Sequence, residues 1–96
     1  MTNLEIANIF RDIASLLEKK KENWFKILAY RKVAEEIEKL TVDLSRLADD
    51  DKLREIPGVG EAIEKKITEM LTTGRLLFYE KLKAEVGVNT GEQNPK

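Results

Sequence analysis

The chain has 96 residues, of which 42% are hydrophobic and 36% charged, and its formal net charge is −1 at pH 7. That length suits one small domain with a modest core and excludes two independent domains. The chain contains no cysteine and no histidine, which excludes disulfides, thiolate catalysis, the usual zinc sites and histidine acid–base chemistry. It has no apolar run long enough to span a membrane and no signal-peptide core, so we expect an intracellular protein without a membrane partner.

The first half of the chain predicts two amphipathic helices. Apolar residues at helical spacing predict a helix over about residues 3–18, and Thr2 and Glu5 have the spacing of a capping box at its start. A second helix, over about residues 24–40, can use Asn23 as its N-cap. Trp24 is expected to be a packing anchor near the start of this helix. The expected buried stripe consists of Val33, Ile37 and Leu40, with Ala29, Tyr30 and Ala34 beside them.

The second half of the chain predicts three further helices and a polar tail. Asp49 to Asp51 favour a helix start, because carboxylates stabilise the positive end of the peptide dipoles, and a short helix is expected over about residues 50–55. The next helix, near residues 60–73, should end at Gly74 in a left-handed C-cap. A last helix is expected over about residues 76–86, stopping at Gly87, with residues 87–96 as a disordered tail. The predicted fold class is all-α, a compact domain of four or five helices over residues 1–86.

The stretch "REIPGVGEAIEKK", residues 54–66, interrupts this helical pattern with one proline and two glycines. Pro57 fixes its own φ and disfavours helix at the preceding residue. Gly58 and Gly60 allow backbone angles closed to other residues and leave no side chain between the backbone and a ligand. The next helix then begins with free N–H groups, which favour anions. An apolar-Pro-Gly-apolar-Gly turn between two helices is typical of a helix-hairpin-helix motif, which contacts DNA phosphates without reading the base sequence.

Charge is distributed unevenly along the chain. Residues 19–32 contain six basic residues and one acid, whereas residues 35–51 contain seven acids and two basic residues. A chain with such a basic segment can bind a polyanion locally while remaining nearly neutral overall. The alternative is that both segments are ordinary solvated helix faces.

Two segments of the chain, "FKILAYRKVAEEIEKL" and "LREIPGVGEAIEKKITEMLTTGRLLFYEKL", together resemble the amino-terminal helix-hairpin-helix domain of family X DNA polymerases, the polymerase beta family. The similarity covers about residues 4–86. It implies binding of gapped or nicked DNA near the 5′-phosphate in base-excision or gap-filling repair. In several members of that family the domain also removes a 5′-deoxyribose phosphate by a lyase reaction. The family's polymerase site lies in a separate domain, so no polymerase activity is expected of this segment.

The resemblance also implies site residues. It places the Schiff-base lysine on Lys66, a basic position of the phosphate pocket on Lys26, and a tyrosine of the same site on Tyr30. The implied DNA contacts are Phe25, Lys26, Arg54, Gly58, Val59, Gly60 and Lys66. The backbone carbonyls of Arg54, Ile56 and Val59 correspond to ligands of a monovalent cation, Na⁺ or K⁺, and no cofactor is required.

The chain departs from the family pattern near this site. Ala62 and Phe78 stand where the family has basic residues, which removes positive charge from the phosphate site. Phe25 replaces a histidine but keeps an aromatic face on which a base can stack. Glu61 and Glu64, beside the hairpin, add repulsion toward a phosphate.

The position of Lys66 on its helix bears on the lyase hypothesis. A lyase amine must be neutral, whereas a free lysine has a pKa of about 10.4. At about 100° per residue, Lys66 borders the apolar stripe that contains Ile63 and Met70, where burial would lower its pKa. Lys26 and Tyr30 are four residues apart and share a face of the second helix, from which Lys26 could supply a second positive charge. The alternative is a lysine that extends from the core edge into water.

The sequence therefore predicts a monomeric DNA-binding domain, with gapped, nicked or 5′-phosphorylated DNA as its partner. Cytoplasmic or nucleoid-associated localisation in a prokaryote is expected. Lyase activity through Lys66 is one hypothesis and a non-catalytic DNA-binding module is another. A helical protein-interaction domain, in which the hairpin only turns the chain, is the third.

Overall fold

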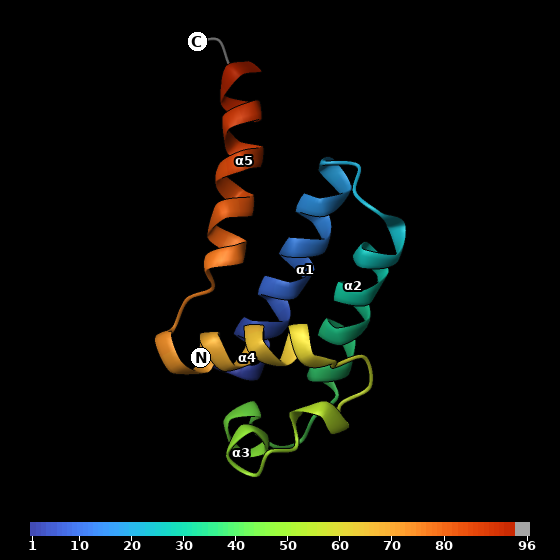
Figure 1. The fold of residues 1–96 in the computed structure, drawn as a ribbon, viewed down its shortest axis with the longest axis vertical. Helices are drawn as coiled ribbons and strands as arrows, with labels where there is room; N and C mark the ends of the chain where they lie inside the picture. Colours follow the sequence, from blue (N-terminus) through green and yellow to red (C-terminus); the bar gives the residue numbers. More distant parts are fainter. Residues whose placement is uncertain (94–96) are drawn as a thin grey trace.

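The computed structural model describes the backbone of residues 1–93 and the side chains of residues 1–87. Its elements, in chain order, are α1 (Asn3–Lys19), α2 (Trp24–Glu38), α3 (Leu44–Asp49), the 3-10 turn η1 (Leu53–Glu55), α4 (Glu61–Thr73) and α5 (Leu77–Gln93). Residues 1–93 contain no strand, which confirms the predicted all-α class. Figure 1 shows α1 and α2 side by side, with α4 crossing near their lower ends, and α1 also packs against α5.

The first helix follows the sequence prediction closely. Its capping box is present, since the backbone N–H of Glu5 donates to Thr2 Oγ1 at 3.1 Å and the N–H of Thr2 donates to Glu5 Oε1 at 2.8 Å. These two bonds satisfy donors that a helix start would otherwise leave unpaired. The buried face of α1 consists of Ile6, Ala7, Phe10, Ile13, Ala14 and Leu17. It forms one wall of the core against α2.

The second helix begins as predicted but buries a somewhat different face. Asn23 Oδ1 accepts a hydrogen bond from the N–H of Phe25 at 2.7 Å, which confirms the N-cap. Trp24 is 55% exposed, so the expectation of a packing anchor was wrong. Figure 1 shows the start of α2 at one end of the α1–α2 pair, and the first three residues of the helix are exposed there. Ala29 is exposed as well, and the buried residues of α2 are Ile27, Tyr30, Val33, Ala34 and Ile37.

The predicted helix over residues 50–55 is present only as the 3-10 turn η1, so its predicted start at Asp49 to Asp51 was wrong. Helix α3 begins earlier and ends at Asp49, and Asp51 has a positive φ of 59°. The physical reason is a cap supplied from α1. Asn3 Oδ1 accepts a hydrogen bond from the N–H of Leu44 at 2.8 Å, and Asn3 Nδ2 donates to the carbonyl of Val42 at 2.8 Å. Because Asn3 is so distant in the sequence, no pattern of residues near Leu44 predicts this cap.

The C-terminal helices agree with the prediction at Gly74 and differ at Gly87. Gly74 ends α4 with a φ of 78°, as predicted. Helix α5, by contrast, continues through Gly87 to Gln93, so the predicted stop at Gly87 was wrong. A glycine ends a helix when it takes the left-handed conformation, and Gly87 does not. Residues 94–96, also part of the expected tail, lie outside the described residues.

The core brings the hairpin and the helices together. Ile56 and Val59, the apolar residues of the hairpin, are buried in the same cluster as Phe10 and Val33. No polar or charged residue is buried among the described side chains.

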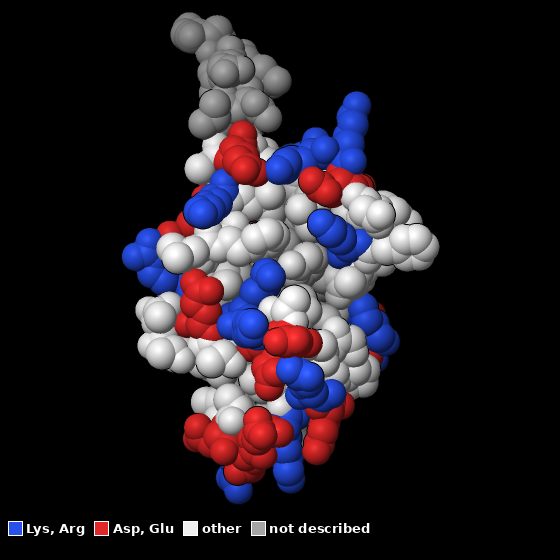
Figure 2. All heavy atoms as spheres, viewed as in Figure 1, with Lys and Arg blue, Asp and Glu red and all other residues white. Residues whose placement is uncertain are grey.

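The surface carries charge of both signs. Figure 2 shows acidic side chains gathered, on the face that it draws, at the end of the molecule where α3 lies. None of the helices within residues 1–93 is long and apolar enough to cross a membrane.

Candidate nucleic-acid interface

The hairpin between η1 and α4 is a closed turn. The N–H of Val59 donates to the carbonyl of Ile56 at 3.0 Å, and Gly58 has a φ of 90°. Proline at the second position of such a turn and glycine with positive φ at the third are typical of a type II turn. Because Ile56 and Val59 are both buried, the turn is held to the core at each end.

Gly58 and Gly60 serve different purposes in this turn. A side chain at Gly58 would be strained by the positive φ, and its Cβ would lie 3.2 Å from Val33 Cγ2 on α2. Gly58 is therefore needed for close packing of the hairpin on α2. A Cβ at Gly60 would meet no atom within 4 Å. Gly60 instead leaves the start of α4 uncovered.

The start of α4 is open to an anion. Gly60 is the N-cap and has no side chain to accept hydrogen bonds from the first turn, whose N–H groups lack partners within the helix. Such N–H groups are suitable donors to a phosphate oxygen. Glu61 and Glu64 lie in the same turn, but each is paired with a basic residue. Glu64 Oε1 lies 2.8 Å from Arg54 Nε, and Glu61 Oε2 lies 3.5 Å from Lys65 Nζ.

Arg54 is thus exposed beside the hairpin but already holds a carboxylate. The hydrogen bond that Arg54 Nε donates to Glu64 is the main reason that the pKa of Arg54 is raised above its ordinary value. A DNA contact by Arg54 would have to share or replace Glu64. In turn, the pairing partly neutralises the repulsion that Glu64 was expected to cause.

The three carbonyls expected to bind a monovalent cation fit that group chemically. The Ile56 carbonyl accepts the hydrogen bond of the turn, while those of Arg54 and Val59 accept none from residues 1–87. Carbonyl oxygens are suitable ligands for a hard cation, and each has two lone pairs. Among the described residues there is no cluster of carboxylates that could hold a metal ion instead.

Helices α1, α2, α4 and α5 line a pocket of about 460 Å³. It brings together three residues singled out from the sequence, Lys26, Tyr30 and Lys66. The other lining residues are Leu17, Lys20, Glu22, Phe78, Lys81, Leu82 and Glu85. Neither Lys20 nor Lys81 was expected at this site, because their position depends on how α1 and α5 pack. Phe25, which is 80% exposed on α2, lies outside the pocket lining.

A second hollow lies beside the start of α4 and shares part of its wall with the pocket. It is lined by Glu61, Ala62, Lys65, Lys66, Glu69, Leu76 and Phe78. Lys66 and Phe78 belong to both hollows. A strand held by the N–H groups of the first turn of α4 would therefore lie next to Lys66.

Aromatic rings form the apolar side of the pocket. The ring of Tyr30 stacks on that of Phe78, with centroids 6.3 Å apart and planes at 17°, and it also contacts Phe10 at 5.8 Å. Burial raises the pKa of Tyr30, so its hydroxyl stays protonated at neutral pH. Lys66 Nζ lies 4.7 Å from the centroid of Phe78, within the range of a cation–π contact.

Lys66 is half-buried at the edge of the α4 core face, beside the fully buried Ile67. Desolvation lowers the pKa of Lys66, and the charge of Glu69 opposes that shift. Lys26 lines the same pocket as Lys66, and a second positive charge from it stays a prediction. Desolvation is the largest cause of the shift, and the ring of Phe78 lies on one side of the amine.

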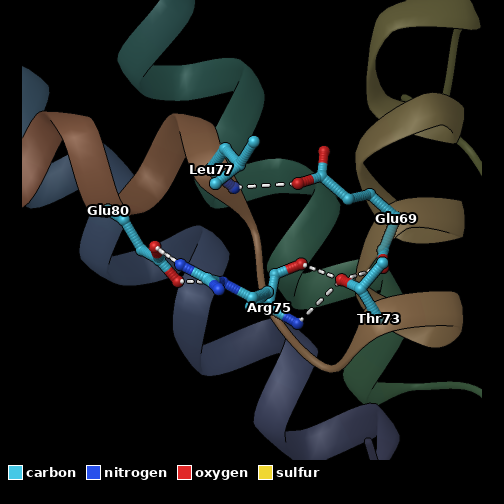
Figure 3. Close-up of polar contacts among 5 residues, drawn as sticks. All are labelled: Glu69, Thr73, Arg75, Leu77 and Glu80. Carbon is cyan, nitrogen blue, oxygen red and sulfur yellow. Dashed lines mark hydrogen bonds and ion pairs between the residues drawn. The ribbon is translucent and has the colours of Figure 1, made fainter.

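Hydrogen bonds and an ion pair hold the connection between α4 and α5 (Figure 3). Glu69 Oε2 accepts from the N–H of Leu77 at 2.9 Å, which caps the first residue of α5. Thr73 Oγ1 donates to the carbonyl of Glu69 at 2.8 Å and accepts from the N–H of Arg75 at 3.2 Å. Arg75 Nε in turn donates to Glu80 Oε2 at 3.0 Å. These bonds fix the turn after Gly74 and thereby the start of α5.

The chain is similar to a known family of protein domains. A family model described as a helix-hairpin-helix domain matches residues 1–76, and the chain belongs to that family. Domains of this family bind DNA, which supports DNA binding by this chain. No protein with a curated description is significantly similar to the chain.

Proposed function

We propose that this domain holds gapped or nicked DNA near a 5′-phosphate, as the amino-terminal domain of a family X DNA polymerase does in repair. The hairpin and the first turn of α4 would bind the sugar–phosphate backbone, and the pocket would receive the phosphorylated end. The observation that carries this proposal is that Lys66 and Phe78 line both the pocket and the hollow at the start of α4.

The charge of the pocket supports an anionic ligand. Four lysines and two glutamates line it, which leaves a net charge of two positive. A terminal phosphate carries a charge of about −1.5 to −2 at neutral pH, and lysine binds phosphate as a point charge. The carbonyls of Arg54, Ile56 and Val59 would hold a monovalent cation that adds positive charge beside the DNA backbone.

Fluorescence anisotropy with labelled duplexes tests the proposal directly. One duplex has a single-nucleotide gap with a 5′-phosphate on the downstream strand, and the matched duplex ends there in a hydroxyl. We expect tighter binding to the phosphorylated duplex, little dependence on base sequence and steep weakening with salt. Equal affinity for both duplexes would overturn the assignment to gapped ends. Absence of binding at low salt would instead favour a protein-interaction domain.

Ala62→Lys provides a gain-of-function variant for the same measurement. Ala62 is exposed and lines the hollow at the start of α4. A lysine there adds one positive charge beside the expected phosphate, so the affinity for the phosphorylated duplex should rise. Lys52, exposed before η1, offers a matched comparison, because Lys52→Ala removes a charge outside both hollows.

A second function, 5′-deoxyribose-phosphate lyase activity, is favoured by the environment of Lys66. Its lowered pKa increases the fraction of neutral amine that can attack the C1′ aldehyde of an open-chain sugar. The nitrogen would form a C=N bond to C1′ and release water. Loss of a C2′ proton to solvent would then break the C3′–O bond and expel the 5′-phosphorylated strand, and water would later hydrolyse the imine. The Tyr30 hydroxyl, also in the pocket, would orient the sugar.

Borohydride trapping tests the lyase step, because the hydride reduces the imine to a stable amine that links protein and DNA. We expect a cross-link with wild-type protein and its loss in Lys66→Ala. Lys65→Ala is the matched control, since Lys65 is the adjacent and exposed lysine of the same helix. An unchanged cross-link in Lys66→Ala would remove Lys66 from the mechanism without affecting the DNA-binding proposal.

A further inference from the structure

One lysine of the pocket is already paired with a carboxylate across the pocket. Lys20 Nζ, at the end of α1, lies 2.7 Å from Glu85 Oε1 on α5, and both residues belong to the pocket lining. Among the side chains of residues 1–87, the other three lysines of the pocket, Lys26, Lys66 and Lys81, form no ion pair. The ion pair with Glu85 thus links the end of α1 to α5 and neutralises the charge of Lys20.

The ion pair between Lys20 and Glu85 can be broken at little cost, so another anion can replace the carboxylate. The side chains of Lys20 and Glu85 are 31% and 58% exposed, and pairs of this kind contribute little to folding because water and salt screen them. Lys20 caps the C-terminus of α1 through its backbone. Its N–H donates a hydrogen bond to the carbonyl of Leu16, and the side chain takes no part in this cap. Replacing the side chain therefore leaves the helix cap in place.

An incoming phosphate would change the charge balance around Lys20. A phosphate dianion has more charge than one carboxylate and three oxygens that accept hydrogen bonds, so it can contact Lys20 together with other lysines of the pocket. Once it replaces Glu85, the four lysines of the pocket face the phosphate with Glu22 as the other carboxylate of the lining.

We propose that Lys20 is a phosphate ligand of the pocket and that Glu85 is its competitor in the free protein. This inference rests on the proposed binding of a 5′-phosphate and adds a residue that sets the preference for it. The carboxylate keeps the pocket closed to weak anions, and a terminal phosphate displaces it.

The test compares affinities for the phosphorylated and the hydroxyl-ended gapped duplex in the full chain. The ratio of the two affinities isolates the phosphate from the rest of the DNA. We expect Lys20→Gln to lower this ratio by about tenfold, the typical effect of one charge-assisted hydrogen bond. Glu85→Gln should raise the ratio, because the competing carboxylate is gone. In the double variant the ratio should equal that of Lys20→Gln alone.

Arg11→Gln and Glu38→Gln are the matched controls. Arg11 and Glu38 form an exposed ion pair between α1 and α2, and neither lines the pocket. Both control variants should leave the ratio unchanged while altering overall charge in the same way. Far-ultraviolet circular dichroism should show the same helix content and melting curve for all variants.

The outcomes separate this inference from the proposed function. A wild-type ratio of one overturns the proposed function, and this inference with it. A wild-type preference that persists in Lys20→Gln overturns only the assignment of Lys20. A rise in the ratio on Glu85→Gln that is just as large in the Lys20→Gln background shows general repulsion and overturns the competition.

Discussion

Lys66 of α4 and Phe78 of α5 are joined by a cation–π contact, with the ammonium nitrogen 4.7 Å from the ring centroid. The same ring stacks on Tyr30 of α2, so three helices meet at one aromatic surface. Lys66 is half-buried beside this surface, and desolvation of the amine lowers its pKa.

Phe78→Ala should raise the pKa of Lys66 toward that of a free lysine, about 10.4. Water would reach the amine, and desolvation is the largest cause of the present shift. The lost ring also removes an attraction for the charged form, but a partly exposed contact of this kind contributes only about 0.5–1 kcal/mol. NMR titration of ¹³C-methylated lysines measures the pKa, with Lys66→Arg assigning the signal.

The neighbouring Leu77→Ala is the control for that experiment, because Leu77 is exposed and lies outside the pocket. It should leave the titration unchanged. If lyase activity is present, its pH profile in Phe78→Ala should move to higher pH, because neutral amine forms only as the pH rises through the pKa. A decrease in the pKa of Lys66 would show that the ring acts through its attraction for charge.

Gly58→Ala should lower the free energy of unfolding by about 1–3 kcal/mol, since the residue has positive φ and little space beside Val33. Urea denaturation measures the change. Gly60→Ala is the matched comparison. It should lower the free energy of unfolding much less, because a Cβ at Gly60 meets no neighbour within 4 Å. Equal losses in the two variants would contradict the view that only Gly58 is needed for packing on α2.

Asn3→Ala should destabilise the protein by about 1–2 kcal/mol, which exceeds the usual effect of an exposed substitution. The side chain forms two hydrogen bonds to the segment that begins α3, with Val42 and Leu44. Hydrogen exchange should become faster at Leu44 while α1 retains its protection through the Thr2 cap. Unchanged exchange at Leu44 would show that α3 does not depend on this distant cap.

Gly87→Ala should stabilise the protein by up to about 1 kcal/mol, the difference between glycine and alanine inside a helix. Gly87 has helical backbone and no neighbour within 4 Å of an added Cβ. Gly74→Ala should have the opposite effect, because Gly74 has a φ of 78°. Thermal melts of both variants check the prediction, and destabilisation by Gly87→Ala would indicate that the helix ends there.

Local pattern was a good guide wherever the partners of a residue are close in the sequence. The capping box of Thr2 and Glu5, the Asn23 cap and the left-handed Gly74 each depend on a few adjacent residues. The Pro-Gly turn of the hairpin belongs to the same group, since its hydrogen bond closes over four residues. Each of these features was predicted.

Prediction failed where the deciding group is distant or where two local signals conflict. Asp49 to Asp51 have the composition of a helix start, yet Asn3 fixes the start of α3 elsewhere. Gly87 resembles a stop signal, but a glycine also fits a helix interior at modest cost. Trp24 has the character of a core residue, and only the position of α2 leaves it exposed.

The amino-acid sequence alone determined the all-α class, the helix-hairpin-helix turn and the edge position of Lys66, because helical periodicity and the angles of proline and glycine are local properties. The tertiary structure decided which side chains surround Lys66. Lys20, Phe78 and Glu85 reach the pocket only because α1 and α5 pack together, and contacts between residues so distant along the chain follow from burial of the shared core.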